Sequence, residues 1–226
     1  RRSLAAFREL FDQLSNELFS RLQVQEFLSC DLIAEDSQFV RLNRSRVRQA
    51  GQVQDAIFRL RFFLKSGKGI HCVERSFTLT GDETQDLKSA VGILSELKNS
   101  ISGLPVDPYA ALPVFRGNIE QIQEGILVSP ESFFDEVLPQ IKNLDLAGIY
   151  ASGAIVRGTQ NSLGQKQWFY TENFSMDYSV YNSEEKAVKS VFAGTNWSTS
   201  DFDQDLEHSV SLLRSLDQPV VRVPRG

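Results

Sequence analysis

Apolar and polar side chains alternate along much of residues 147–197. Between Trp168 and Val180 the even positions are mostly apolar and the odd positions are mostly polar. Because successive side chains of a β-strand point to opposite faces, this pattern predicts strands with one face on a core and the other toward water. Asn-Ser-Leu-Gly at 161–164 and Asn-Ser-Glu-Glu at 182–185 interrupt the alternation and are typical of turns. The stretch therefore predicts three consecutive antiparallel strands.

Four other stretches have apolar side chains at spacings of three and four residues, which is the pattern of a helix with one buried side. They are residues 3–22, 82–100, 129–141 and 200–216. The second begins at Asp82, which forms a capping box with Gln85, and the last is expected to begin at a Ser200 cap and to end before Pro219. In the third helix we expect the buried residues to be Phe133, Phe134, Val137, Leu138 and Ile141.

Further strands are predicted in the first half of the chain, where the alternation is looser. They are residues 26–43 (a strand or a bent pair), 45–55, 56–65 and 70–79. The resulting order is helix–strands–helix–linker–helix–strands–helix. This order indicates an α+β fold with largely antiparallel sheets and flanking helices, because parallel βαβ units would alternate strands and helices more regularly.

The linker marks the expected division of the chain. Residues 104–128 contain three prolines and no sustained periodicity, which indicates an extended connector. We therefore expect one helix–sheet–helix subdomain at 1–103 and a second at 129–226. The second would lead into a C-terminal domain that is not in this chain.

Composition narrows the class of protein. Of the 226 residues, 41% are hydrophobic, which allows a substantial core. The 24 basic and 29 acidic residues give a net charge of −5, which argues against a dedicated nucleic-acid binder. No apolar run approaches the roughly 18 residues that span a bilayer, so no membrane association is expected. Cys30 and Cys72 lie in strand-like runs of a chain too large to need disulfides, and the reduced thiols that we expect there suggest the cytoplasm.

The sequence offers little catalytic chemistry. Its two histidines, His71 and His208, belong to no zinc-binding pair, and neither a nucleophile elbow nor a phosphate-binding glycine loop occurs. We therefore assign no catalytic residue, metal ligand or cofactor to this chain, and an independent enzyme is the least favoured interpretation. Four aromatic positions on the apolar face are interpreted as core in preference to a ligand platform: Trp168, Tyr170, Phe174 and Tyr178.

Positive charge is concentrated in one segment. Between Arg41 and Arg75 there are nine Lys or Arg residues and two acidic residues, and Arg44, Arg46 and Arg48 are expected on one strand face. Such a face is able to bind an acidic protein or nucleic acid. The simpler interpretation is a solvated sheet face that protects an edge from aggregation. We expect no exposed aromatic residues of the kind that stack bases in this segment, which favours the simpler interpretation.

Five segments resemble TldD/PmbA-type proteins, historically called modulators of DNA gyrase. The segments are FVRLNRSRVRQAGQVQDA (39–56), LAGIYASGAIVRGTQNSLGQKQWF (146–169), SMDYSVY (175–181), AVKSVFAGTNW (187–197) and DQPVVRVPRG (217–226). In this order they are similar to the N-terminal half of that family, and the last is similar to its lead into the C-terminal domain. The resemblance spans nearly the whole chain.

This resemblance implies a bacterial, cytoplasmic protein of a metallopeptidase system. There, TldD-like and PmbA-like (TldE-like) subunits pair and degrade or mature unfolded peptides, and the catalytic subunit holds zinc with a His-Glu-x-x-x-His helix and a distant cysteine. Glu207-His208 lacks the second histidine, so no zinc ligand transfers to this chain. Zinc is therefore expected in the rest of the protein or in its partner subunit.

From the resemblance we expect a non-catalytic N-terminal region that forms a homo- or heterodimer with a TldD/PmbA-type subunit and helps to enclose unfolded peptide. Strand addition at an exposed sheet edge is one way to hold such a peptide. The alternative is an interaction module that binds an acidic protein or nucleic acid through residues 41–75. Candidate peptide- or partner-binding residues are Asn161, Ser162 and Gly164, which match the family's Asn-Ser-x-Gly, together with Arg44, Arg46 and Arg48.

Overall fold

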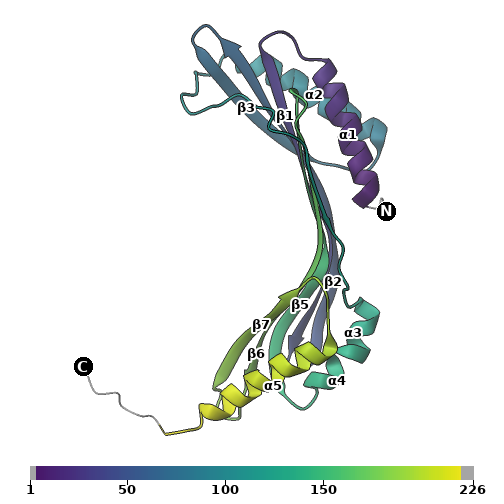
Figure 1. Ribbon diagram of the computed structural model, residues 1–226, viewed down its shortest axis with the longest axis vertical. Coiled ribbons are helices and arrows are strands. Elements are labelled where there is room, and N and C mark those ends of the chain that lie inside the picture. Colours follow the sequence, from purple (N-terminus) through teal and green to yellow (C-terminus); the bar gives the residue numbers. More distant parts are fainter. Residues whose placement is uncertain (1–3, 220–226) are drawn as a thin grey trace, which may run out of the picture. The chain divides into compact units, whose positions relative to one another are not determined.

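A computed structural model describes residues 4–219 of the chain (Figure 1). The helices are α1 (Leu4–Ser20), α2 (Glu83–Ile101), α3 (Pro130–Glu136), α4 (Leu138–Ile141) and α5 (Thr199–Ser215). The strands are β1 (Glu26–Asn43), β2 (Arg46–Ser66), β3 (Gly69–Thr78), β4 (Ile119–Gln123), β5 (Asp145–Asn161), β6 (Lys166–Tyr181) and β7 (Ala187–Gly194). Most of the closing segment 217–226, which the resemblance includes, lies outside the described residues.

The described strands form one largely antiparallel sheet. Its order is β3-β2-β1-β5-β6-β4, and β7 also pairs with β6. β2 and β3 are antiparallel, as are β6 and β7, whereas β4 is parallel to β6. The expected α+β class is confirmed, and the three consecutive strands predicted between 147 and 197 are β5, β6 and β7.

Contacts divide the chain into two compact units, each assembled from separate stretches. The α1 unit consists of the residues up to Asp36, Gln54–Gln123 and Ala154–Thr171, and the α5 unit consists of Ser37–Val53, Glu124–Gly153 and the residues from Glu172 onward. Both units include parts of β1, β2, β5 and β6. They differ from the consecutive subdomains 1–103 and 129–226 because long strands pair residues that are far apart in the sequence. Independent folding of 1–103 stays a prediction.

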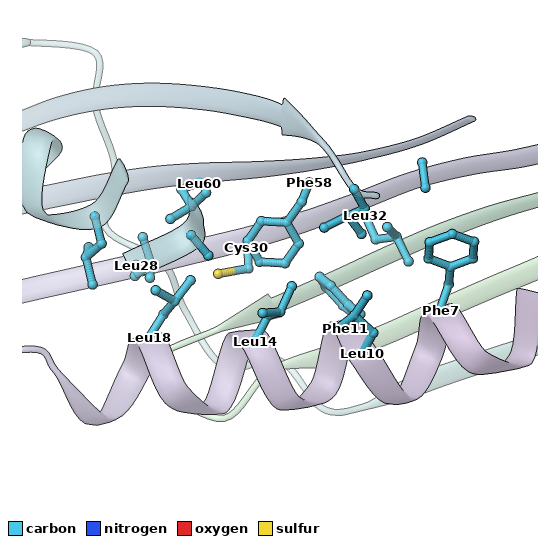
Figure 2. Packing of buried hydrophobic residues seen from close by; sticks show 14 of the residues in the cluster. Phe7, Leu10, Phe11, Leu14, Leu18, Leu28, Cys30, Leu32, Phe58 and Leu60 are labelled. Atoms are coloured by element: carbon cyan, nitrogen blue, oxygen red, sulfur yellow. The ribbon is translucent and has the colours of Figure 1, made fainter. Parts of the chain in front are cut away.

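In the α1 unit, α1 buries one side against the sheet (Figure 2). Its buried residues recur at the predicted spacings of three and four, and they are Phe7, Leu10, Phe11, Leu14 and Leu18. They pack with sheet residues of the same hydrophobic cluster, which include Leu28, Cys30, Leu32, Phe58 and Leu60. Each fully buried Leu or Phe side chain stabilises the fold by about 1.5–3 kcal/mol. The amphipathic pattern of residues 3–22 thus corresponds to a real core contact.

The start of α2 confirms the predicted cap. The Asp82 side chain accepts a hydrogen bond of 2.9 Å from the backbone N–H of Gln85. The backbone N–H of Asp82 donates to Thr80 Oγ1 at 3.1 Å, so Thr80 takes the role that a capping box gives to the Gln85 side chain. α2 then packs on the same cluster as α1 through Ala90, Leu94, Leu97 and Ile101.

Part of the expected connector is a strand. β4 pairs with β6, and α1 also holds it, because Arg8 donates two hydrogen bonds to the Glu120 carboxylate at 2.6 and 2.9 Å. The Arg8 guanidinium carbon also lies 5.2 Å from the ring centroid of Trp168. Hydrogen bonding from Arg8 lowers the pKa of Glu120. The side chains of this five-residue strand are all exposed, so the sequence shows no alternation that would predict it.

In the α5 unit, the helices α3, α4 and α5 cover one face of the sheet (Figure 1). Aromatic rings dominate this core: Trp197 lies 5.1 Å from Phe174 and 5.2 Å from Phe202, measured between ring centroids.

Two predictions about these helices are wrong. The N-cap of α5 is Ser198, whose side chain accepts a hydrogen bond from the Asp201 N–H, so the predicted Ser200 cap is wrong by two residues. Phe134, expected to be buried, is 51% exposed.

The hairpin between β1 and β2 corrects two further expectations. Residues 45–55 and 56–65 form the single strand β2, which runs from Arg46 to Ser66. Arg44 does not share a strand face with Arg46 and Arg48, because Arg44 and Ser45 form the turn, with φ of 51° and 54°. Positive φ at both central residues is the requirement of a two-residue hairpin turn that matches the strand twist.

Candidate functional site

Most polar groups of the turn at Asn161–Gly164 are hydrogen-bonded to other residues of the protein. Asn161 is 5% exposed, and its Oδ1 accepts hydrogen bonds from the N–H groups of Leu163 and Gln165 at 3.0 and 3.2 Å. Ser162 exchanges two hydrogen bonds with Leu28: its N–H donates to the Leu28 carbonyl at 2.9 Å, and its Oγ accepts from the Leu28 N–H at 3.2 Å. Gly164 has a φ of 91°, which suits glycine. These contacts tie the turn to β1.

The same turn also fixes the path of the connector. Asn161 Nδ2 donates to the Val114 carbonyl at 3.0 Å, and Gln165 Oε1 accepts from the Arg116 N–H at 2.7 Å. Gln165 Nε2 donates to the Gly117 carbonyl. The structure therefore gives Asn161 and Gln165 a positioning role immediately before β4, whereas Ser162 contacts β1. The proposed part of Asn161, Ser162 and Gly164 in binding stays a prediction.

The basic segment 41–75 does not form one charged face. Arg41, Arg44, Arg46 and Arg48 belong to the α5 unit, whereas the five basic residues from Arg59 onward belong to the α1 unit. There, acidic residues neutralise much of the charge: Arg59 lies 3.3 Å from Asp31, and Arg61 lies 2.6 Å from Glu74. Lys65, Lys68 and Arg75 of the α1 unit are exposed and belong to none of the ion pairs within residues 4–219, so both units keep basic residues that are accessible to an external anion.

A groove lies on the α5-unit sheet face opposite the helices. Its volume is about 570 Å³. We call it the Arg41 groove, and its lining includes Arg41, Arg48, Ile149, Asp177, Ser179 and Tyr181. The two-residue turn at 44–45 places Arg41 opposite Arg48 on the neighbouring strand. Of the three predicted arginines, the structure brings only Arg48 to this groove and adds Arg41, which the sequence analysis missed.

The outer margin of β7 is a free strand edge among residues 4–219, since β7 pairs only with β6. Asn182 N–H donates to the Lys186 carbonyl at 3.0 Å, which makes this the first hydrogen-bonded pair of the hairpin. Hydrogen-bonded and non-bonded pairs alternate along an antiparallel ladder. The backbone groups that point away from β6 are therefore those of Ala187, Lys189, Val191 and Ala193. Their side chains are exposed.

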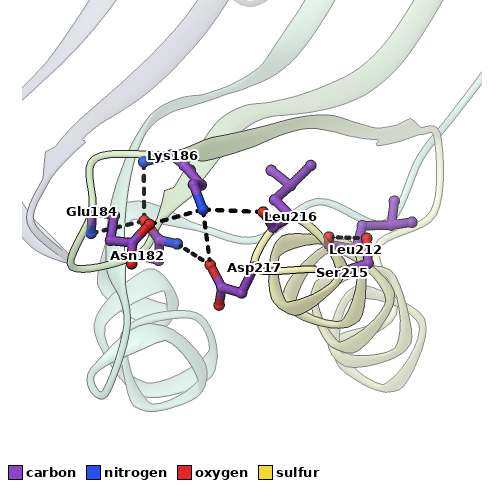
Figure 3. Close-up of polar contacts among 7 residues, drawn as sticks. All are labelled: Asn182, Glu184, Lys186, Leu212, Ser215, Leu216 and Asp217. Atoms are coloured by element: carbon purple, nitrogen blue, oxygen red, sulfur yellow. Dashed lines mark hydrogen bonds and ion pairs between the residues drawn. The ribbon is translucent and has the colours of Figure 1, made fainter. Parts of the chain in front are cut away.

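The β6–β7 loop is anchored to the end of α5 (Figure 3). Asn182 Nδ2 donates to Asp217 at 2.9 Å, and Lys186 Nζ donates to the Leu216 carbonyl at 3.0 Å. Lys186 also forms an ion pair of 2.8 Å with Glu184, and that hydrogen bond is the main reason why the pKa of Lys186 is raised. The predicted reversal at 182–185 is confirmed, and it holds the beginning of β7 in place.

The histidines and thiols are dispersed. His71 Nδ1 lies 2.9 Å from the Leu104 carbonyl and its Nε2 lies 3.2 Å from Ser66 Oγ, which links the connector to the β2–β3 hairpin. His208 is exposed on α5, and Cys30 and Cys72 are free, on β1 and β3. Across residues 4–219, no three His, Cys, Asp or Glu side chains are grouped so that they hold a metal. The described residues therefore do not fit the zinc site that the resemblance implies.

No helix between residues 4 and 219 has the length and apolar composition needed to cross a membrane.

Comparison with known proteins shows which solved structures have a similar fold. No protein-family model matches the chain, and no curated protein matches it in sequence. Among solved structures, TldE from Thermococcus kodakarensis is similar over 92% of this chain and 47% of its own, with a TM-score of 0.59 and 12% identity. A protein from Thermotoga maritima described as a modulator of a DNA gyrase is similar over 97% of this chain and 50% of its own (TM-score 0.58, 11% identity).

A third solved structure, from Bacteroides thetaiotaomicron and also described as a modulator of DNA gyrase, is similar over 95% of this chain and 51% of its own, with a TM-score of 0.59 and 12% identity. The chain thus spans about half the length of the structures that it matches. The likeness to TldD/TldE-type proteins that the sequence segments indicated is confirmed at the level of the fold.

Proposed function

We propose that this chain is a non-catalytic, N-terminal region of a TldD/TldE-type protein, which pairs with a subunit of that type and helps to hold unfolded peptide. The proposal rests on one observation, the likeness of fold over 92–97% of the chain to TldE and to two proteins described as gyrase modulators. The zinc of such a peptidase would be bound outside residues 4–219, in the rest of the protein or in the partner subunit. The role of this chain is then to position peptide for hydrolysis elsewhere.

The β7 edge is the favoured place for the peptide. An extended peptide that adds to a sheet edge bonds through its backbone and so tolerates many sequences. β7 offers four residues with outward N–H and C=O groups, and β6 is its only partner strand within residues 4–219. The loop contacts to α5 hold β7 in position before a peptide arrives, which reduces the ordering cost of binding.

The variant Val191→Pro tests whether peptide binds by strand addition at the β7 edge. The Val191 N–H points away from β6, so proline removes an outward donor without breaking a bond of the β6–β7 ladder. Val191→Thr is the matched control, because threonine keeps the donor and the strand preference. Binding of a fluorescein-labelled, unstructured neutral peptide is measured by anisotropy. We expect the proline variant to bind about tenfold more weakly and the threonine variant to match the wild type.

Two results would contradict strand addition at this edge. One is unchanged binding by Val191→Pro, and the other is an equal loss in both variants. Circular dichroism of each variant verifies that β-structure is retained.

The proposed pairing with a TldD-type subunit is tested by a separate experiment. A purified TldD-type subunit is assayed for peptide hydrolysis with and without this chain, and complex formation is followed by analytical ultracentrifugation. We expect a complex and a change in the hydrolysis rate. If adding the chain changed neither the sedimentation coefficient nor the hydrolysis rate of the TldD-type subunit, the pairing would be contradicted.

The alternative function, an interaction module for an acidic protein or nucleic acid, has narrower support. Residues 41–75 are divided between the two units, and Arg59 and Arg61 are already paired with acidic residues. What supports it is the arginine group of the α5 unit.

A further inference from the structure

The Arg41 groove has an uncompensated positive charge. None of the ion pairs formed within residues 4–219 includes Arg41 or Arg48. The carboxylate in the groove, Asp177, lies 3.1 Å from Lys189 Nζ and is therefore already neutralised. Both arginines are exposed, and they extend from adjacent strands toward the same hollow. The groove therefore has a net positive charge that a ligand is able to neutralise.

The rest of the lining suits a polypeptide. Ile149 and Tyr181 are 41% and 38% exposed, so the groove presents apolar surface beside its two arginines. The small residues Ala147 and Ser179 leave room between them. Aliphatic stems of a bound segment are able to cover Ile149 and Tyr181 while its carboxylates reach the arginines. Arginine is the residue best matched to carboxylates, because its planar fork donates two parallel hydrogen bonds.

We propose that the Arg41 groove docks an acidic polypeptide segment, with Arg41 and Arg48 each pairing with a carboxylate and Ile149 and Tyr181 contacting the aliphatic parts. This site is independent of the proposed peptide binding at the β7 edge, which depends on backbone groups. Nucleic acid suits the groove less well. Nucleic-acid binding draws its affinity from many phosphate contacts, and the lining of the groove supplies only two basic side chains, Arg41 and Arg48.

The hairpin supplies a matched control for the test. Arg44 and Arg46 lie on the same hairpin as Arg41 and Arg48, and they are also exposed, but they do not line the groove. The double variant Arg41→Ala/Arg48→Ala therefore removes the groove charges, whereas Arg44→Ala/Arg46→Ala removes the same net charge from nearby. A difference between the two double variants separates the groove from general attraction.

The measurement is anisotropy of a fluorescein-labelled (Gly-Glu)₄ peptide with the whole chain, beside a (Gly-Ser)₄ peptide of equal length. We expect the chain to favour the acidic peptide, with affinity falling as salt rises from 50 to 300 mM. The Arg41→Ala/Arg48→Ala variant should lose about tenfold in affinity, and Arg44→Ala/Arg46→Ala less than about twofold. Urea unfolding of both variants verifies that they fold equally well.

Three outcomes would overturn the proposal. The first is no preference for the acidic peptide in the wild-type chain, and the second is an equal loss in both double variants. The third is tighter, Arg41-dependent binding of a DNA oligonucleotide, which would identify nucleic acid as the partner. Val191→Pro should keep the part of (Gly-Glu)₄ binding that depends on Arg41 and Arg48, so failure at the β7 edge and failure at the groove are told apart.

Discussion

The Tyr178 hydroxyl donates a hydrogen bond of 2.6 Å to the Asp205 carboxylate and thereby joins β6 to α5. Ser209 Oγ lies 3.1 Å from the same phenol oxygen, and Ser190 Oγ donates to Asp205 at 3.2 Å. Tyr178 is 1% exposed, so these bonds are made in a nearly dry environment. The attachment of α5 to the sheet therefore combines aromatic packing with a satisfied polar network.

Removing the Tyr178 hydroxyl should destabilise the chain. Tyr178→Phe leaves Asp205 with one fewer donor in a partly buried site, and we expect the free energy of unfolding to fall by about 1–3 kcal/mol. Tyr181→Phe is the control, because Tyr181 is on the opposite, more exposed face, and it should change stability by less than about 0.5 kcal/mol. Urea unfolding followed by circular dichroism measures both. Equal stability of the two variants would show that the network contributes little.

The same phenol predicts how stability depends on alkaline pH. Burial, reinforced by the hydrogen bond to Asp205, raises the pKa of Tyr178 to about 12. In the unfolded chain a tyrosine has a pKa of about 10. Since the folded state holds the proton more tightly, this contribution to the free energy of unfolding is complete below pH about 10 and is lost as pH rises to about 12.

Ultraviolet absorbance at 295 nm during an alkaline titration measures this directly. The wild-type chain should show a late tyrosine component with a midpoint near pH 12. That component should be smaller by one tyrosine in Tyr178→Phe, since burial also raises the pKa of Tyr150. A Tyr178→Phe titration identical to that of the wild type would contradict the assignment.

Asn161 separates a positioning role from a binding role. Asn161→Ala removes hydrogen bonds to Val114, Leu163 and Gln165, and we expect a loss of about 1–3 kcal/mol in the free energy of unfolding. Leu163→Ala in the same turn is the control, because Leu163 is 45% exposed and should tolerate the change. If Asn161→Ala weakened binding of the neutral peptide and left unfolding unchanged, the residue would instead act in recognition.

The two thiols should differ in reactivity. Cys30 is fully buried, which raises the pKa of its thiol, and Cys72 is half-buried, with its pKa also raised by burial. With a chromogenic disulfide reagent at pH 8, we expect slow reaction of Cys72 in the native chain and reaction of Cys30 only after unfolding. Cys72→Ser should abolish the native reaction. If neither cysteine reacted even in denaturant, the two would form a disulfide. We do not expect one, because β2 lies between the strands that carry Cys30 and Cys72 and keeps their Cα atoms too far apart.

Much of the fold was predictable because local patterns reflect burial. The stripe of α1, the Asp82 cap of α2 and the alternation of β6 all correspond to observed elements, since in each case the neighbours that matter lie within four residues. β4 was missed because its side chains are exposed and its strand character comes from pairing with residues 167–171 of β6. The buried side chain of Phe133 and the exposed one of Phe134 were not distinguished, since that choice depends on where α3 meets the sheet.

The candidate sites were less predictable. Arg44, Arg46 and Arg48 have strand-like spacing, but Arg44 and Ser45 form a turn, and Asn43 and Ser45 were the available signals for it. Arg41 reaches the groove only because the hairpin places it opposite Arg48. The free edge of β7 has no signature in its own residues, since an edge is defined by the absence of a neighbouring strand.

Most helices and strands, the α+β class and the turns at 161–164 and 182–185 were predictable from the sequence, because these depend on side-chain periodicity and on the few residues that favour a reversal. The strand order, the division of β1, β2, β5 and β6 between two units, and the Arg41 groove, whose lining comes from these four strands, emerged only from the tertiary structure. The physical reason is that sheet pairing joins residues far apart in the sequence, so register and edge position follow from the packing of the whole sheet.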